Sequence, residues 1–215
     1  MDIVIQAIPF ITKGLWVTLQ VSLLVVAMSL VAGVLLGAAL VYGPLPLRWL
    51  IRGFSDVIRG IPVLVLIFAV YYVLPPLGLN LSNITSAVAA LTVFATAQVI
   101  EIARGAIQSI HHGQMEAGKA IGLRFGQRLA WIILPQAMRR FLPPWINSVT
   151  DAVKGSALVS LVGVVDLMLA IQQVIGRIYE PLPLYLLGAF VYFAINYTLS
   201  TLSRRLEARY AYIRE

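Results

Sequence analysis

The sequence predicts an all-α, polytopic membrane protein with about five transmembrane helices and one helical hairpin outside the bilayer. Of the 215 residues, 60% are hydrophobic and only 12% are charged, whereas a soluble domain carries about 25% charged residues. Two long stretches, 14–47 and 60–100, contain no charged residue. A membrane-spanning helix needs about 20 apolar residues. The stretch 113–135 is by contrast polar, charged and rich in helix-forming residues.

The net charge of +7 could suggest nucleic-acid binding, but in a membrane protein basic residues are more commonly retained on the cytoplasmic side. We therefore expect a lipid bilayer as partner and no nucleic acid. The absence of cysteine excludes disulfides and thiolate metal sites. The first apolar run is longer than a signal-peptide core, so we expect a retained span rather than a removable signal.

The first predicted span covers about 14–42. Gly33 and Gly37 of this span either allow another helix to approach closely or are present only because glycine is common in membrane helices. A Gly-Pro turn at 43–46 follows. Residues 47–59 then combine arginine with tryptophan, leucine and phenylalanine, which predicts an interfacial amphipathic helix.

The next two spans form a pair, about 61–75 and 84–104, divided by the turn-forming Pro75 and Pro76. Asn83 and Ser86 are expected to cap the second of these. The fourth span, about 144–169, is less uniform and should break near Gly155. A loop over 172–183 and a final span over about 184–203 complete a single transmembrane domain, 1–215.

Basic residues decide the predicted orientation. With alternating spans, only Lys13 and Arg177 fall on one side of the membrane, and Lys154 lies within a span. The positive-inside rule then places the N-terminus outside and the C-terminus in the cytoplasm. The residues on the cytoplasmic side are Arg48, Arg52, Arg59, Arg104, Lys119, Arg124, Arg128, Arg139, Arg140, Arg204, Arg205, Arg209 and Arg214.

The cytoplasmic segment 113–135 is predicted to be two short helices. Gly122 permits the left-handed backbone that commonly closes a helix, and Pro135 should interrupt the second helix. The residues 113–119 also match G-x-x-x-x-G-K, but Ala120 replaces the hydroxyl that would hold magnesium and no strand precedes the match. Glu116 either stabilises its own helix N-terminus or contacts a partner.

Charged residues within the predicted spans are the other candidates for function. Glu101 and Arg104, and likewise Asp151 and Lys154, lie three residues apart. Each set is either an intrahelical ion pair or part of a translocation pathway. His111 and His112 are adjacent and diverge on a helix, so no metal site is expected. No nucleophile and base are placed together, so we expect no catalytic residues.

Several fragments, in order, resemble the polar amino acid permeases of bacterial ABC uptake systems, which are type I importers. The pattern of Glu116, Ala117, Gly122 and Pro135 resembles the EAA loop of that family, with Gly118 where a second alanine is usual. The fragments are GLWVTL (14–19), IRGIP (58–62), EIARGAI (101–107), GQMEA (113–117), ILPQA (133–137) and KGSAL (154–158).

This resemblance implies a subunit of the bacterial inner membrane that imports polar or charged amino acids. It implies a second permease copy or paralogue, two ATP-binding subunits and an external solute-binding protein. ATP and magnesium would bind the ATPase subunits, and no cofactor would bind this chain. The fragment at 154–158 departs from the usual Lys-Asp-Thr-Ser-Leu by losing the carboxylate and moving the hydroxyl.

The resemblance also implies roles for individual residues. Those expected to couple to the ATPase are Gly113, Gln114, Glu116, Ala117, Gly122 and Pro135. Those expected along the translocation pathway are Glu101, Arg104, Asp151, Lys154 and Ser156.

Three other classes compete with an ABC permease. A channel or half of a secondary carrier would share the apolar spans but would not need the cytoplasmic hairpin. A membrane enzyme would need a clustered active site. A purely structural assembly subunit would tolerate neutralisation of its membrane charges.

Overall fold

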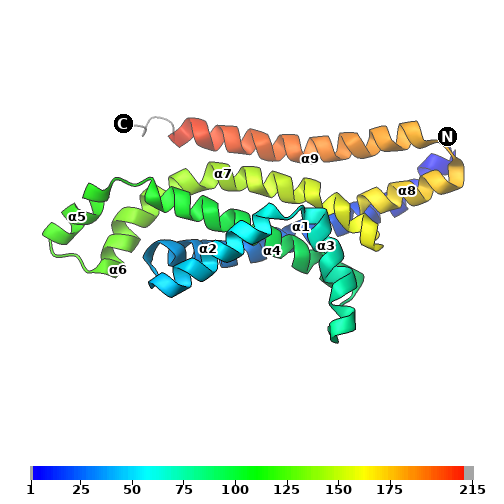
Figure 1. The fold of residues 1–215 in the computed structure, drawn as a ribbon. Helices are drawn as coiled ribbons and strands as arrows, with labels where there is room; N and C mark the ends of the chain where they lie inside the picture. The colour runs from blue at the N-terminus through cyan, green and yellow to red at the C-terminus, as the bar shows by residue number, and fades with distance from the viewer. Residues whose placement is uncertain (1, 211–215) are drawn as a thin grey trace.

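The computed structural model describes residues 2–210, which form helices and short turns without a strand (Figure 1). Three helices are long and apolar enough to cross a bilayer by themselves: α1 (Asp2–Tyr42), α4 (Asn83–Gln108) and α9 (Pro181–Tyr210). Two bent helix pairs would bring the number of spans to five if each pair crosses once. The all-α, polytopic fold is as predicted.

Helices α1 and α4 pack extensively against each other. A Cβ atom added to Gly33 would lie 2.5 Å from Val99 Cβ, and one added to Gly37 would lie 2.7 Å from Ala103 Cβ. The α1 backbone therefore packs directly against α4 at both glycines, as expected if these glycines allow two helices to approach closely. Helix α1 also begins at Asp2 rather than near residue 14, because its extra turns pack Ile11 against the buried side of α8.

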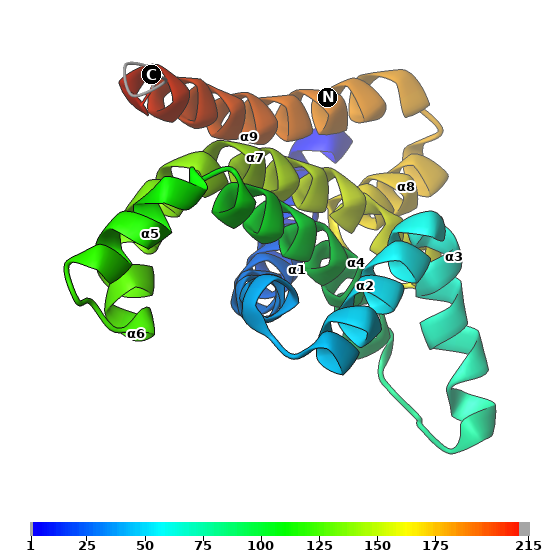
Figure 2. The same cartoon turned by 60° about the vertical axis from the view of Figure 1, so that its left-hand side comes forward.

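The segment after α1 bends sharply. Helix α2 (Leu45–Gly60) lies against α4, and Ser55 Oγ donates a hydrogen bond to the Ala97 carbonyl at 3.2 Å. A bend of 104° then leads into α3 (Val63–Phe68) and the π-helical turn η1 (Ala69–Val73). The 3₁₀ turn η2 (Pro75–Leu77) projects away from the bundle (Figure 2). Helix α4 is capped by Ser82, which accepts from Thr85 N, and not by Asn83 or Ser86 as predicted.

The chain beyond α4 makes one short helix and then one long helical rod. Helix α5 (His112–Ala120) is followed by α6 (Phe125–Arg128), the π-helical turn η3 (Leu129–Ile133) and α7 (Leu134–Gly155), without a break from α6 onward. The predicted interruption at Pro135 is therefore wrong. Proline cannot donate to the preceding turn, and here that turn is widened, with Leu134 N bonded to Leu129 O.

The end of the rod does change its helical form near Gly155, as predicted. The 3₁₀ helix η4 (Ser156–Val162) follows α7 and ends at Gly163, whose φ is +79°. Helix α8 (Leu167–Ile178) comes next, so the loop predicted from residue 172 is wrong. This stretch is helical because Leu167, Ile171 and Val174 bury one face of α8 against α1 and α9.

A buried polar junction holds α1, α8 and α9 together. Asp166 is fully buried and caps α8, since its Oδ1 accepts from Leu169 N at 2.9 Å. Thr18 Oγ1 of α1 accepts from Leu167 N at 3.0 Å, and the Tyr192 hydroxyl of α9 donates to Asp166 Oδ2 at 3.4 Å. An unpaired polar group is costly in an apolar bundle, so these hydrogen bonds favour the observed meeting of the three helices.

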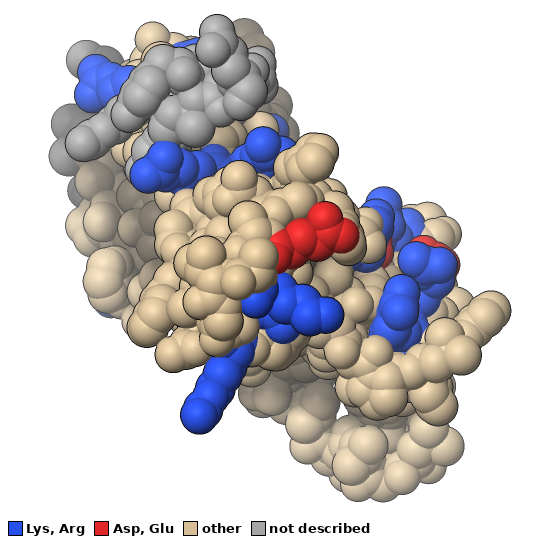
Figure 3. Space-filling view, turned by 90° about the vertical axis from the view of Figure 1, so that its left-hand side faces the viewer, with Lys and Arg blue, Asp and Glu red and all other residues tan. Residues whose placement is uncertain are grey.

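The hairpin of α5 and α6 lies at the same end of the bundle as the C-terminal end of α9, and the N-terminal end of α1 lies at the opposite end (Figure 1). Basic side chains gather at the hairpin end (Figure 3). Arg177, at the far end, stacks over the Phe10 ring. Arg214, one of the basic residues used to predict orientation, lies outside the described residues.

Candidate functional site

The hairpin turns on Gly122, which has a φ of +82°. Leu123 N donates to Gly118 O and Gly122 N donates to Lys119 O, each at 3.0 Å. These two bonds form the Schellman motif that closes helices on a left-handed residue. The conformation predicted for Gly122 is confirmed, and it allows the chain to reverse before α6 begins.

The outer face of α5 carries most of the residues expected to couple to a partner. Gln114, Glu116, Ala117 and Gly122 are exposed, and Gly113 is half-buried. Glu116 Oε1 lies 3.2 Å from His112 Nδ1, and both side chains are largely exposed. Glu116 therefore has a local partner and is also open to a second molecule.

The inner face of the hairpin packs onto the bundle. Buried Ile110, Ile133 and Ala137 form an apolar cluster that joins the end of α4 to the rod. Gln136 Nε2 donates to Gln114 Oε1 at 3.4 Å, and Arg140 donates to the Ser109 carbonyl. Pro135 lies on the rod near this base, and so the structure does not bring it to the tip with Glu116.

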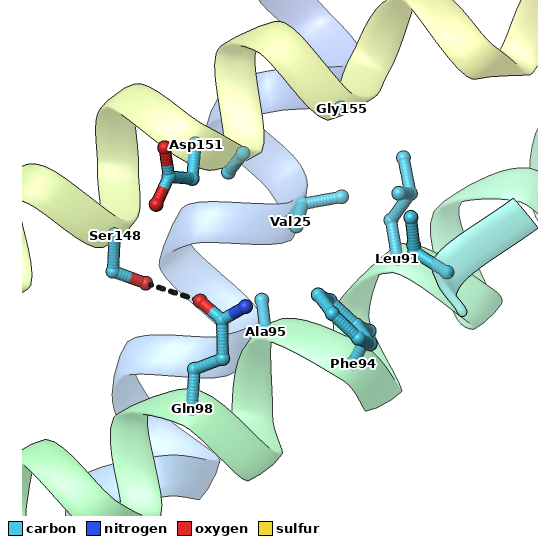
Figure 4. Close-up of a pocket in the computed structure, with 10 residues that line it drawn as sticks. Val25, Leu91, Phe94, Ala95, Gln98, Ser148, Asp151 and Gly155 are labelled. Atoms are coloured by element: carbon cyan, nitrogen blue, oxygen red, sulfur yellow. Dashed lines mark hydrogen bonds between the residues drawn. The ribbon is translucent and has the colours of Figure 1, made fainter. Parts of the chain in front are cut away.

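A second candidate region is a pocket among α1, α3, α4 and α7 with about 360 Å³ of open space. Gln98 and Ser148 face one another across it, and Ser148 Oγ donates to Gln98 Oε1 at 3.2 Å (Figure 4). Asp151 lies one helical turn beyond Ser148, and Phe94 lies about one turn before Gln98 (Figure 4). The pocket thus offers an amide, a hydroxyl, a carboxylate and an aromatic ring within a largely apolar wall.

Glu101 and Arg104 form an ion pair toward the hairpin end of α4. Arg104 Nη2 lies 2.6 Å from Glu101 Oε2, and Arg104 Nη1 donates to Gln108 Oε1 at 2.6 Å. Arg59 adds a longer contact to Glu101 at 3.9 Å. These charges compensate one another, and the residues that line the pocket do not include them.

Asp151 and Lys154 form a looser pair on α7, with 3.5 Å between Oδ1 and Nζ. Their side chains are 65% and 59% exposed, although they lie in an otherwise apolar stretch of the bundle. Ser156 is fully buried, and its hydroxyl donates to Val153 O. The structure brings Asp151 to the pocket but does not place the Ser156 hydroxyl there.

Phe94, Gln98 and Ser148 line the pocket but are not among the site residues predicted from the sequence. Two of them carry a signal that could have been found, because Gln98 and Ser148 are uncharged polar residues in apolar stretches. Each precedes a carboxylate of the predicted pathway by three residues, and residues three apart share a helix face. No feature of the neighbouring sequence distinguishes Phe94 from other apolar residues of its span. It belongs to the pocket only because α7 lies opposite it.

Comparisons with known proteins agree with this architecture. The family described as "Binding-protein-dependent transport system inner membrane component" matches residues 29–212. A probable glutamine ABC transporter permease protein of Bacillus subtilis (strain 168) is 35% identical, over 95% of each chain. The glutamine transport system permease protein of Escherichia coli (strain K12) is 36% identical, over 94% of each chain. A crystal structure of an amino acid ABC transporter with histidines matches with a TM-score of 0.89 and 30% identity, over 96% of each chain.

Proposed function

The chain belongs to the family of binding-protein-dependent transport system inner membrane components, and from that premise we propose how it works. It is a multi-pass membrane protein and the permease subunit of an ABC importer, a class that works with ATP-binding and solute-binding subunits. We propose that the exposed face of α5 docks on an ATP-binding subunit. Hydrolysis of ATP, with its magnesium, belongs to that partner.

The observation that carries this proposal is the unbroken rod of α6, η3 and α7. It begins at Phe125, next to the turn of the hairpin, and continues to Gly155. Asp151 lies about 40 Å further along the rod than Phe125, at 1.5 Å per residue. A displacement of the hairpin therefore moves one wall of the pocket directly.

The distribution of charge supports a cytoplasmic hairpin. Arg104, Lys119, Arg124, Arg128 and Arg140 all lie on the hairpin or at its base. The positive-inside rule assigns such an end to the cytoplasm. The C-terminal end of α9 then lies on the same side and the N-terminus lies outside, where the solute-binding protein delivers its cargo.

The exposed charges of α7 support a second permease, either another copy or a paralogue. Asn147, Asp151 and Lys154 share one exposed face of α7. A charged side chain facing lipid at the bilayer centre costs at least about 2.5–3.5 kcal/mol. A second permease packed on this face, with two ATP-binding subunits below, would place the three side chains along a wet route between the permeases.

The groups around the pocket fit a polar amino acid as the solute. Gln98 and Ser148 can exchange hydrogen bonds with an amide or hydroxyl, and Asp151 can meet an ammonium group. Lys154, beside Asp151, supplies a cation for a carboxylate. Two of the relatives are named as glutamine permeases, and the solved structure is of an amino acid transporter with histidines, so their solutes belong to this class.

The test of coupling compares Gly122→Val with Gly126→Val in the complete importer. Both glycines have open space around the Cβ position, but only Gly122 has a positive φ. A left-handed conformation costs an L-residue about 1–2 kcal/mol, and more for a β-branched side chain. We expect Gly122→Val to abolish uptake and substrate-stimulated ATP hydrolysis in proteoliposomes while membrane insertion is unchanged. Gly126→Val should retain both activities.

Normal transport by Gly122→Val in an intact complex would contradict the proposal. Transport that persists after ATP depletion would instead support a channel or carrier.

A further inference from the structure

A ring contact joins the hairpin to the cytoplasmic end of α1. Tyr42 is the last residue of α1, and Phe125 is the first residue of α6. Their ring centroids are 5.4 Å apart and the ring planes make an angle of 79°. This edge-to-face geometry is one that aromatic pairs prefer. The contact thus joins the first residue of the rod to a helix that is distant from the rod along the chain.

Arg128 holds Phe125 in place from within the hairpin. Its guanidinium carbon lies 5.9 Å from the centre of the Phe125 ring, and its Nη1 donates to the Met115 carbonyl at 3.4 Å. One arginine side chain therefore connects α5, α6 and the aromatic pair. When the tip of the hairpin is displaced, these three parts are held to move together.

Gly118 makes room for this arginine. A Cβ atom at Gly118 would lie 2.9 Å from Arg128 Cγ and 2.6 Å from Ile132 Cδ1. Both distances are shorter than carbon atoms approach in proteins, so any larger residue would displace the arginine stem. Gly118 is accordingly buried on the inner face of α5.

From Tyr42 back toward its N-terminal end, helix α1 reaches the pocket. It also packs against α4, which forms the wall of the pocket opposite α7. Val25 of α1 lines the pocket. At Gly33 and Gly37 the backbone of α1 touches α4, which carries Gln98. Packed helices shift as bodies and do not deform continuously, so a movement of the α1 end reaches both helices.

We propose that the Tyr42–Phe125 contact is a second mechanical link, through which the hairpin moves α1 and α4 while the rod moves α7. This proposal rests on the proposed docking of α5 to an ATP-binding subunit. Tyr42 and Phe125 are then positioning residues for transport. They keep the two walls of the pocket moving together, so that each cycle of ATP hydrolysis is used to move solute.

The test measures uptake and ATP hydrolysis by the same purified importer in proteoliposomes, and reports solute moved per ATP. We expect Phe125→Ala and Tyr42→Ala each to lower this ratio by about two- to tenfold, the range that an aromatic pair supplies. ATP-binding subunits should still copurify. Because both variants remove one contact, the double variant should be no worse than the poorer single one. Tyr42→Phe keeps the ring and should restore the ratio.

Phe193→Ala is the matched control, since it removes an exposed aromatic stacked on Tyr197 of α9, away from the hairpin. Its ratio should be unchanged. If Phe125→Ala unsettles the hairpin, Tyr42→Ala probes the same contact from α1. An unchanged ratio in Tyr42→Ala, or losses that multiply in the double variant, would overturn the link. If instead the proposed docking of α5 on an ATP-binding subunit is wrong, the result is a different one, namely normal transport by Gly122→Val.

Discussion

The hairpin and the α1–α4 interface are held together by opposite means. The hairpin rests on a few side-chain contacts, a positive φ at Gly122 and the apolar cluster at its base. At Gly33 and Gly37 of the α1–α4 interface, the α1 backbone packs directly against Val99 and Ala103 of α4, with no side chain of α1 between them. The hairpin, held by few contacts, can be displaced as a unit. Helices α1 and α4 are packed so closely at the two glycines that they can only move together. The permease therefore has a movable part mounted on a rigid one.

The largest expected effect comes from a side chain added to the rigid part. Gly33→Val would place a Cβ atom 2.5 Å from Val99 Cβ, and α1 and α4 would have to separate. Overpacking of this kind typically costs about 1–3 kcal/mol or more. We expect a markedly lower unfolding temperature in detergent and loss of assembled importer.

Gly53→Val is the control for this substitution, because Gly53 is exposed on α2 and a Cβ atom there would meet no neighbour within 4 Å. It should unfold close to the temperature of the unsubstituted protein. Equal destabilisation by the two substitutions would mean that the glycine contact of α1 and α4 is not what makes this region rigid.

An intermediate effect is expected at the exposed pair on α7. Lys154→Gln removes the cation that we propose to meet the carboxylate of the solute, and it leaves Asp151 without its partner on the proposed route between the permeases. Uptake should fall by tenfold or more, at roughly 1.4 kcal/mol per factor of ten. The double variant Asp151→Asn/Lys154→Gln should assemble better than Lys154→Gln, as measured by size-exclusion chromatography of the complex.

Normal uptake by both of these variants would remove the pair from the translocation route. If Glu101 is neutralised as well and uptake is still unaltered, the subunit would have a structural role in assembly only.

The smallest effect on stability is expected on the movable part. The His112–Glu116 pair is exposed, and such pairs contribute about 0–1 kcal/mol. His112→Ala and Glu116→Ala should therefore unfold at similar temperatures. Their functional effects should differ, because only Glu116 is proposed to touch the ATP-binding subunit.

Substrate-stimulated ATP hydrolysis measures that difference, and Glu116→Ala should lower it well below the value for His112→Ala. Equal hydrolysis rates would mean that Glu116 serves only its own helix.

Much of this molecule could be predicted because its signals are local. An apolar composition indicates a membrane span however the helices pack, because a span needs apolar residues along its whole length. The position of the hairpin followed from its polarity. The left-handed Gly122 followed from the rule that helices commonly close on glycine.

The errors concern features that distant contacts decide. Pro135 was expected to end a helix, but the π-helical turn before it accommodates the missing donor within a packed rod. Residues 172–178 were expected to form a loop, but the apolar face of α8 finds α1 and α9 to cover it. Local propensity is weak beside the burial of an apolar face.

The sequence by itself determined the membrane class, the resemblance to ABC permeases and the place of the hairpin, because each is written in residues that are close together along the chain. Only the tertiary structure decided that Gln98 and Ser148 meet across a pocket and that Tyr42 touches Phe125. Those contacts join residues 50 or more positions apart. They exist because glycine lets α1 approach α4 and because an unbroken rod carries α7 past them both.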